Sequence, residues 1–326
     1  MTESLAPRKL GSSDLRVSPI GLGCWQFSKG RGLSGKFWPN LPDEEIEDIV
    51  RVSLEGGINW FDTAESYGSG ESERALAAAL KKLGKTPTDA IIATKWMPLF
   101  RTAKSILKTI DRRVANLEGF RIDLYQIHHP VSFSSVRAQM KAMAQLVDEQ
   151  KIRYIGVSNF SAKKMLAAHK ALSEFGLAVV SNQVHYSLLN RKIETNGVLD
   201  AARDYGISII AYSPLDQGIL SGKFHEDPAS IRRRTGLRKY RASFKPKGLE
   251  KSQPVIEVLR RIAENHGLSP AQVALNWLIH VHGDTVLAIP GATKASQARD
   301  NVEAMSFKLT ADEMDSLDRV SSPFKK

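Results

Sequence analysis

The sequence has very little cysteine and no long apolar run, and each absence excludes a class of protein. Cys24 is the only cysteine in 326 residues, so no intrachain disulfide can form and a reducing compartment is expected. No apolar stretch approaches the ~18 residues of a membrane-spanning helix. The first residues also lack the basic and then apolar order of a signal peptide. We therefore expect a cytoplasmic protein with no membrane partner.

Glycine-rich nucleotide motifs and metal-ligand clusters are missing as well. Neither Gly21-Leu22-Gly23 nor Gly68-Ser69-Gly70 continues to the third glycine of a dinucleotide-binding fingerprint. No Walker A run is present, and no Cys or His pairs have zinc spacing. His128 and His129 are adjacent on a predicted strand and would point to opposite faces, which is unsuitable for one metal ion. The sequence therefore predicts no metal site.

Acidic residues are too few to balance the basic ones. The chain has 46 Lys and Arg against 35 Asp and Glu, a net charge of +11, which favours anionic partners such as nucleic acid or a phosphorylated cofactor. The densest basic run, 231–241, has no interleaved aromatic residue except Tyr240, and no nucleic-acid motif accompanies it. Arg232 to Arg234 are more typical of a solvated face than of a phosphate clamp. We expect no nucleic-acid partner.

Short apolar strands alternate with amphipathic helices along the chain. Helices are expected near 44–54, 71–83, 103–117, 134–149, 162–172, 194–205, 254–265, after 269 and after 310. Strands are expected at 20–23, 59–62, 91–95, 124–128, 154–158, 178–183, 208–212 and 286–290. Alternation of this kind indicates a parallel sheet, and eight units without a compositional break indicate a (β/α)8 (TIM) barrel of the α/β class.

Two additions to the barrel are predicted. Residues 9–17 read as a β-hairpin ahead of the first strand, because two short arms flank a Gly-Ser-Ser-Asp turn. Residues 215–252 form a long irregular insertion after the seventh strand, and ordered loops of this length tend to be lids or binding loops. No linker divides the chain, so 1–326 is expected to be one barrel domain.

The ends of successive strands carry side chains suited to acid–base chemistry. Asp62 ends the second strand, Tyr67 lies in the following loop, Lys95 ends the third strand and His128 the fourth. In a TIM barrel the C-terminal strand ends share one mouth, where the chemistry takes place. A lysine that ends a buried strand is costly unless it is paired, and Asp62 is the available partner.

These residue types define a reaction class. A tyrosine with its ordinary pKa of about 10 is a poor proton shuttle at neutral pH, and a nearby ammonium such as that of Lys95 is expected to lower the pKa of Tyr67. His128 adds a second donor for a carbonyl oxygen. The site can thus deliver a proton to that oxygen, while the hydride would come from a nicotinamide cofactor.

Longer runs around these residues are distinctive. They cover 57–64 with Tyr67-Gly68, Lys95, 123–130, 156–160, 183–186, 212–215, 218–223 and 289–292. With these runs the chain resembles the aldo-keto reductase superfamily over nearly its full length. The resemblance implies a catalytic tetrad of Asp62, Tyr67, Lys95 and His128, with Tyr67 as the proton donor. It also implies NADP(H), or alternatively NAD(H), extended across the barrel mouth, and a small carbonyl substrate.

The resemblance also implies the cofactor contacts. Ser158, Asn159 and Gln183 would hold the carboxamide, and Tyr212 would stack on the nicotinamide. Ser213, Leu215 and Lys223 would cover the pyrophosphate, and the adenosine end would be held by Gly291, Thr293, Gln297, Asp300 and Asn301. Further expected cofactor contacts are Trp25, Asp62, Pro214 and Gly218. Apart from the resemblance, Arg233 of the basic run is expected to reach a phosphate of the cofactor.

The segment after the eighth strand departs from many eukaryotic members. Those have a Lys-Ser pair after the proline and an Arg six residues beyond that Lys, where this chain has Gly291-Ala292 and Gln297. Thr293 and Gln297 resemble instead the bacterial and channel-β-subunit branch. We expect tighter binding of NADPH than of NADH.

Two functions other than carbonyl reduction remain possible, and the role of one aromatic loop is also open. A non-catalytic NADP sensor like the potassium-channel β subunits has Asn in place of the fourth-strand His, so His128 favours an enzyme. A sugar or polyol dehydrogenase working in the oxidative direction would use the same residues. Trp25, Phe27, Phe37 and Trp38 could form a substrate-pocket wall or merely pack their loop. The sequence indicates neither the substrate nor the oligomeric state.

Overall fold

Eight parallel strands form one closed sheet in the computed structural model, which describes residues 6–233 and 237–326. Each strand pairs with the next one in sequence, and bridges from Ile20 to Ala288 and from Gly23 to Gly291 close the ring. The strands are β3 (Leu22–Gly23), β4 (Trp60–Asp62), β5 (Ile91–Trp96), β6 (Ile122–Ile127), β7 (Ile152–Ser158), β8 (Val179–His185), β9 (Ser208–Tyr212) and β10 (Val286–Ile289). The predicted (β/α)8 barrel is confirmed.

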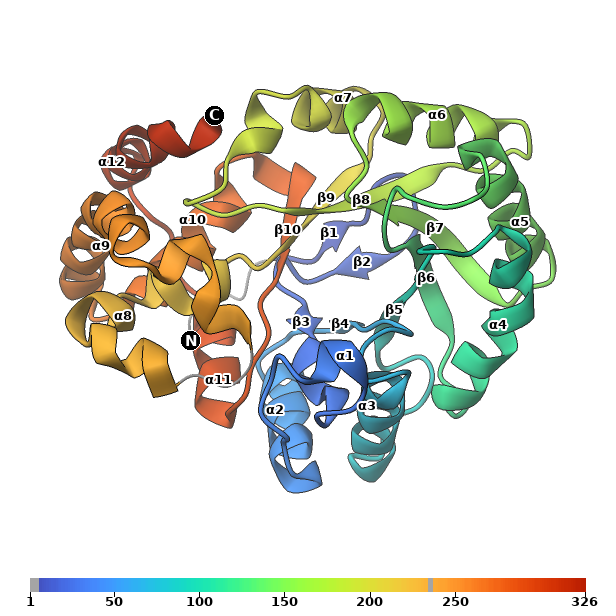
Figure 1. Ribbon diagram of the computed structural model, residues 1–326, viewed down its shortest axis with the longest axis horizontal. Helices are drawn as coiled ribbons and strands as arrows, with labels where there is room; N and C mark the ends of the chain where they lie inside the picture. The colour runs from blue at the N-terminus through green and yellow to red at the C-terminus, as the bar shows by residue number, and fades with distance from the viewer. Residues whose placement is uncertain (1–5, 234–236) are drawn as a thin grey trace.

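Helices surround the barrel (Figure 1), because consecutive parallel strands need a crossover connection. They are α2 (Asp43–Glu55), α3 (Glu71–Lys82), α4 (Lys104–Asn116), α5 (Val136–Asp148), α6 (Ala162–Ser173), α7 (Val198–Asp204), α9 (Pro246–His266), α10 (Pro270–His280), α11 (Ala295–Glu303) and α12 (Ala311–Ser321). Capping boxes at Ser269 and Thr310 start α10 and α12, as their sequences predict. Within 6–233 and 237–326, no helix is long and apolar enough to cross a membrane.

The barrel interior is filled by every second residue of the strands, because successive side chains point to opposite faces. Trp60, Leu124 and Leu287 belong to one buried cluster. The hairpin of β1 (Arg8–Lys9) and β2 (Arg16–Val17), drawn in dark blue across the middle of Figure 1, adds apolar side chains to this cluster. The predicted hairpin therefore closes the N-terminal end of the barrel. The C-terminal ends of the strands lie at the opposite end.

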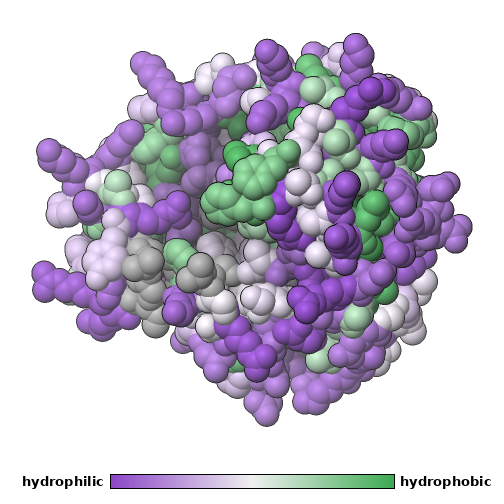
Figure 2. Space-filling model, turned by 45° about the vertical axis from the view of Figure 1, so that its right-hand side comes forward, coloured by the Kyte–Doolittle hydropathy of each residue, from purple (hydrophilic) through white to green (hydrophobic). Residues whose placement is uncertain are grey.

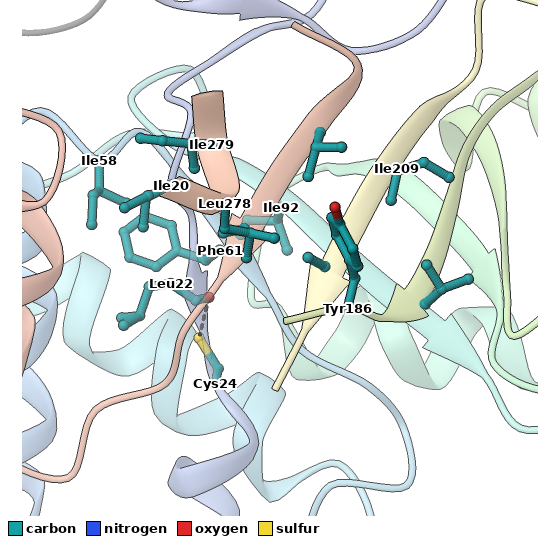
Figure 3. Packing of buried hydrophobic residues seen from close by; sticks show 14 of the residues in the cluster. Ile20, Leu22, Cys24, Ile58, Phe61, Ile92, Tyr186, Ile209, Leu278 and Ile279 are labelled. Atoms are coloured by element: carbon teal, nitrogen blue, oxygen red, sulfur yellow. Dashed lines mark hydrogen bonds between the residues drawn. The ribbon is translucent and has the colours of Figure 1, made fainter. Parts of the chain in front are cut away.

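The other residues of each strand face outward and pack under the helices. Figure 3 shows Ile20, Leu22 and Phe61 of neighbouring strands in the same buried cluster as Leu278 and Ile279 of α10. Burying one such side chain completely contributes about 1.5–3 kcal/mol. This layer fixes the strands from whose ends the site is built.

Three helices differ from the prediction. α7 begins at Val198 and not at residue 194, because Gly197 precedes it with φ 80° and 192–194 form a separate turn. α9 begins at Pro246, eight residues before the Pro254 at which the sequence predicts its start, and it continues through that proline. α11 has no counterpart among the predicted helices, because its nine residues include few apolar ones.

The insertion after β9 is less irregular than its sequence predicts. It contains the short helical segments η3 (Asp216–Ser221), α8 (Lys223–Glu226), η4 (Pro228–Arg233), η5 (Leu237–Tyr240) and η6 (Ala242–Phe244). Ile219, Phe224, Ile231 and Phe244 form a small buried cluster beneath these turns. The apolar residues are too widely spaced to show helical periodicity, although together they give the insertion a core of its own.

Candidate active site

The strand register brings the expected catalytic side chains into one layer of the barrel. Trp60 points into the barrel from β4, so Asp62, two residues later, does so as well. On the neighbouring strands Lys95 is directly paired with Gln126, and His128 follows the end of β6. The side chains thus meet above the apolar filling of the barrel.

Lys95 and Asp62 form the buried ion pair that the sequence suggests. The ammonium Nζ of Lys95 lies 2.5 Å from Oδ1 of Asp62 and donates to the carbonyl of Thr63 at 2.9 Å. Lys95 is 0% exposed, so burial by itself lowers its pKa, but Asp62 and Tyr67 outweigh burial and raise the pKa. Lys95 therefore remains a cation within the barrel.

The second oxygen of Asp62 is held by two glutamines. Its Oδ2 accepts from Nε2 of Gln183 at 2.8 Å and from Nε2 of Gln126 at 3.1 Å. Gln183, expected at the carboxamide, thus also serves the carboxylate. Gln126 is a site residue that the sequence analysis does not identify. A polar side chain two residues before His128 on the same buried strand is the signal that reveals it.

Tyr67 lies at the open side of this ion pair. Its hydroxyl is 3.4 Å from Nζ of Lys95, its ring stacks on Trp25 with centroids 5.8 Å apart, and the His128 ring meets it edge-on at 5.6 Å. The expected lowering of its pKa is wrong. Burial raises the pKa of Tyr67 above its ordinary value; Lys95 opposes this, and Asp62 adds to it. The hydroxyl therefore keeps its proton at neutral pH.

His128 is a neutral imidazole. Burial lowers its pKa well below the ordinary value, and the charges of Lys95 and His129 lower it further. Its Nδ1 lies 3.4 Å from the hydroxyl of Ser66, in the same loop as Tyr67. A neutral ring with one nitrogen engaged in the protein has the other available to a substrate oxygen.

Asn159 connects this layer to the next strands. Its amide nitrogen donates to the backbone carbonyl of His128 at 3.3 Å, and its Oδ1 accepts from the Tyr212 hydroxyl at 2.9 Å. Ser158 and Gln183 are linked by a 2.9 Å hydrogen bond. The structure therefore brings together the residues expected to hold a carboxamide, and Asn159 has a left-handed φ of 61°, which asparagine tolerates.

The loop after β9 continues this surface with unusual backbone geometry. The ring of Tyr212 stacks on His185 at 5.5 Å. After Ser213 and the buried Pro214, the residues Asp216, Gln217 and Gly218 all have positive φ, at 43°, 59° and 95°. Consecutive residues in this region are costly and are found mainly at functional sites. Only the glycine takes the conformation without steric cost.

The polar groups of segment 291–301 show whether this part of the chain suits the adenosine end of a dinucleotide. Thr293 donates to Oε1 of Gln297 from both its backbone nitrogen, at 2.8 Å, and its hydroxyl, at 3.1 Å. The buried amide nitrogen of Asn301 has no hydrogen-bond partner among the described residues, and burial raises the pKa of nearby Asp300. An amide donor that is buried without a partner suits a ligand acceptor, so these residues fit the group.

Gly291 marks a close approach at the same end of the barrel. A side chain there would overlap Gln26, at 2.0 Å from its Nε2. Gln26 follows Trp25 in η1 (Trp25–Ser28), and its buried Oε1 has no hydrogen-bond partner in the described part of the chain. Gln26 was not indicated by any sequence motif.

Lys223 and Arg233, the cations of the insertion that are expected at the pyrophosphate, lie at the surface. Lys223 begins α8, while Arg233 is 70% exposed and its guanidinium lies 2.5 Å from Asp227. Arg234 of the basic run lies outside the described residues. Among residues 6–233 and 237–326, no group of three or more His, Cys, Asp or Glu is placed to hold a metal ion.

The first loop carries a cluster of aromatic side chains that reaches Tyr67 through Trp25. Phe37 and Trp38 both lie 5.7 Å from Trp25, which stacks on Tyr67. Phe27, by contrast, is fully buried in the core beneath the helices. Of the two readings of this loop, Trp25, Phe37 and Trp38 therefore fit a pocket wall, and Phe27 fits packing.

The loops after β5 and β6 carry a second apolar group that the sequence analysis does not identify. Leu99, Phe100, Val131 and Phe133 are all largely exposed, and the rings of Phe100 and Phe133 are 6.2 Å apart. Phe100 has φ 56°, a rare conformation for a bulky side chain. Figure 2 shows hydrophobic residues gathered in a projecting patch on the face that it displays.

Comparisons with known proteins agree with this architecture. The family model of the aldo/keto reductase family matches residues 19–322. The Uncharacterized oxidoreductase Rv2298 of Mycobacterium tuberculosis and the Uncharacterized oxidoreductase Mb2320 of Mycobacterium bovis are each 38% identical over 312 residues, covering 95% of this chain and 91% of theirs. The chain belongs to the aldo/keto reductase family, and it is an oxidoreductase of that family.

Two solved structures share the fold of this chain and are also similar to it in sequence. A thermostable aldo-keto reductase, Tm1743, in complex with the inhibitor epalrestat, is 28% identical with a TM-score of 0.75, over 97% of this chain and 100% of that one. The glycerol dehydrogenase AKR11B4 from Gluconobacter oxydans is 26% identical with a TM-score of 0.82, over 98% of this chain and 96% of that one.

Proposed function

We propose that the protein is an NADP(H)-dependent oxidoreductase that reduces an aldehyde or ketone to the alcohol, with Tyr67 as the proton donor. The observation that supports this best is the buried sequence of contacts from Asp62 through Lys95 to Tyr67, beside a neutral His128. The hydroxyl of Tyr67 can give its proton to a carbonyl oxygen as negative charge develops there. Lys95 then stabilises the phenolate, since its own charge is held in place by Asp62.

The chain's own residues would position the cofactor. Ser158, Asn159 and Gln183 would hold its carboxamide end, the loop 213–218 would bind its pyrophosphate, and Thr293, Gln297 and Asn301 its adenosine end. A bound nicotinamide supplies the hydride that no side chain can supply. We propose NADP(H) in preference to NAD(H), because the chain is strongly basic and Lys294 follows Thr293.

The aromatic wall favours substrates with an apolar group. Trp25 stacks on Tyr67, and Phe37 and Trp38 pack on Trp25, so a carbonyl compound with an aromatic or alkyl group would bury apolar area there. A screen of NADPH oxidation with aldehydes, ketones, sugars and pyridoxal tests this choice. Turnover of apolar aldehydes should exceed that of sugars; the opposite order would contradict the proposed substrate class.

The Tyr67→Phe variant tests the proton donor. The ring and its stack on Trp25 remain, while the hydroxyl is lost. We expect turnover to fall by at least ~10²-fold, the lower end for general acid catalysis, with an unchanged dissociation constant for NADPH. Near-normal turnover in this variant would remove Tyr67 from the mechanism.

A second function is favoured by one comparison. The glycerol dehydrogenase with the same fold makes oxidation of a polyol the alternative for this chain. The Tyr67 hydroxyl, whose pKa burial raises above its ordinary value, carries the proton that reduction needs at neutral pH, whereas oxidation needs the phenolate. Initial rates of NADP⁺ reduction with glycerol and other polyols distinguish the two directions; faster oxidation than reduction at pH ~7 would favour the dehydrogenase. A non-catalytic sensor would show neither carbonyl reduction nor polyol oxidation.

A cytoplasmic location remains a prediction.

A further inference from the structure

A buried arginine outside the proposed tetrad binds the loop of Tyr67 at both ends. Arg113, on α4, is 3% exposed. Its Nη1 donates to Oε2 of Glu65 at 2.8 Å, and its Nε lies 2.9 Å from Oε2 of Glu73. Tyr67 lies between these two glutamates in the sequence, so one guanidinium fixes both ends of the segment that carries it.

The first end, at Glu65, is also attached to the strand of Lys95. Glu65 is buried; its backbone nitrogen donates to the carbonyl of Lys95 at 3.2 Å, and its Oε1 accepts from the backbone nitrogen of Met97 at 2.6 Å. Arg101 also donates to this oxygen. The position of Glu65 relative to β5 is thereby fixed by contacts that do not involve the Tyr67 hydroxyl.

The second end, at Glu73, is attached to the outer face of the same strand. Glu73 is 0% exposed and accepts from the hydroxyl of Thr94 at 2.7 Å and from the amide of Asn116 at 2.8 Å. At Gly70, between the two ends, an added side chain would lie 2.4 Å from the amide of Asn116 and 3.2 Å from Nη2 of Arg113. The segment 65–73 is therefore held against α4 and β5 at Glu65, Gly70 and Glu73.

Stability alone is a weak reason for such an arrangement. Taking charges out of water is costly, and well-packed apolar residues often stabilise a core as well as a buried ion pair does. Burial raises the pKa of Glu73. The charge of Arg113 and the hydrogen bonds from Asn116 and Thr94 oppose this increase without cancelling it. The hydrogen bond from Nη1 gives Glu65 a fixed direction, which an apolar contact would not provide. The contact at Nε lacks hydrogen-bond geometry, so Arg113 holds Glu73 by charge at short range.

We propose that Arg113 is a positioning residue for the reaction: by binding Glu65 and Glu73 it holds the 65–73 segment so that the Tyr67 hydroxyl stays aligned with Lys95 and the substrate oxygen. Arg113 touches neither of these groups and acts only through the segment. The inference rests on the proposed role of Tyr67 as proton donor. A shift of the order of 1 Å at a reacting group can cost ~10²-fold in rate, so even partial loss of the clamp should be measurable.

The test compares Arg113→Lys with Arg191→Lys in the full-length protein. Lysine keeps the positive charge but replaces a planar fork by one ammonium, which is a poor bridge between two carboxylates. Arg191 is also a buried arginine that bridges two carboxylates, and its partners Glu194 and Asp318 belong neither to the tetrad nor to the expected cofactor contacts, so it is a matched control. Turnover is measured at saturating NADPH with the best aldehyde of the screen, alongside the melting temperature and the dissociation constant of NADPH.

We expect Arg113→Lys to lower turnover by about 10-fold or more with an unchanged NADPH dissociation constant, whereas Arg191→Lys lowers only the melting temperature. The same change is then made in Tyr67→Phe, where it should have almost no further effect on turnover, because residues that act as a unit are not additive. Wild-type turnover in Arg113→Lys, or an equal loss in both backgrounds, would overturn the proposal.

Two further results separate the possible failures. If Tyr67→Phe itself keeps its turnover, the proposed function fails, and the positioning role fails with it. If Tyr67→Phe is inactive and Arg113→Lys is fully active, only the positioning role fails. Should Arg113→Lys not fold, Glu73→Gln replaces it, since it removes the charge that binds Nε and keeps the size; the same non-additivity with Tyr67→Phe is expected.

Discussion

The two sides of the barrel mouth are built in different ways. On the side of the proposed proton transfer, called the proton-transfer side and formed by Asp62, Tyr67, Lys95 and His128, the ion pair is buried and its partners lie on neighbouring strands. On the lid side, the insertion 215–245, Lys223 and Arg233 lie at the surface on short helical segments. The positions of the first group are fixed by the sheet itself. The positions of the second group depend on the small apolar cluster beneath the insertion.

This difference has a physical reason. Charges that act on a transition state are most effective where water is excluded and where their positions are fixed beforehand. Cations that capture a phosphorylated cofactor need access to solvent, since the ligand must enter and leave. We therefore expect changes on the proton-transfer side to affect stability and turnover, and changes on the lid side to affect binding.

The largest expected effect comes from breaking the buried ion pair. Lys95→Met leaves the carboxylate of Asp62 without its cation, and loss of one partner of a buried pair typically destabilises by about 3–5 kcal/mol. Gln126 and Gln183 still donate to Asp62, which favours the lower end of this range. Denaturant unfolding measures the change. As a control on the lid side, Lys223→Met should change the unfolding free energy by less than about 0.5 kcal/mol. Equal losses in the two variants would contradict the comparison.

The next effect concerns cofactor choice and salt. We expect NADPH to bind more tightly than NADH in a fluorescence titration, and the difference to shrink as sodium chloride rises from roughly 0.05 M to roughly 0.5 M, because salt screens exposed charges far more than buried ones. Turnover at saturating cofactor should stay constant over the same range, since the Lys95–Asp62 pair is inaccessible to ions. Equal dissociation constants for both cofactors would show that the preference is wrong.

A smaller effect is expected at the lid. Arg233→Ala should weaken NADPH binding by about 1–2 kcal/mol if its guanidinium reaches a phosphate, and it should leave the unfolding free energy almost unchanged because the pair with Asp227 is exposed. Trypsin provides an independent measurement: NADPH should slow cleavage after Lys223, Arg233 and Arg241. Identical digestion with and without NADPH, together with an unchanged dissociation constant, would favour a purely solvent-facing role.

The smallest effect is the absence of a pH response in the reducing direction. His128 has a pKa lowered well below 6.5 by burial, so it is neutral throughout the neutral range, and the raised pKa of Tyr67 keeps its proton in place. Turnover in reduction should therefore be constant from pH ~6.5 to ~9, whereas alcohol oxidation, which needs the phenolate, should rise with pH. A loss of reduction between pH 7 and 8 would show that one of these groups titrates there.

Much of the fold and of the proton-transfer side could be predicted from the sequence. Apolar runs alternate with helical periodicity, and the acid, phenol, amine and imidazole follow successive strands, so the barrel and the meeting of Asp62 with Lys95 could both be expected. The exceptions are local. The start of α7 depended on the φ of Gly197, and α11 has too few apolar residues to show a period.

The rest depended on contacts between residues far apart in the chain. Gln126 and Gln183 converge on Asp62 from strands β6 and β8, and Arg113 of α4 pairs with both Glu65 and Glu73. Periodicity and strand ends are local properties of the chain, so they specify the barrel, its mouth and the residue types available there. The direction of the pKa shift of Tyr67 depends instead on the folded chain, since burial and the carboxylate of Asp62, which opposes the effect of Lys95, arise from packing around the hydroxyl.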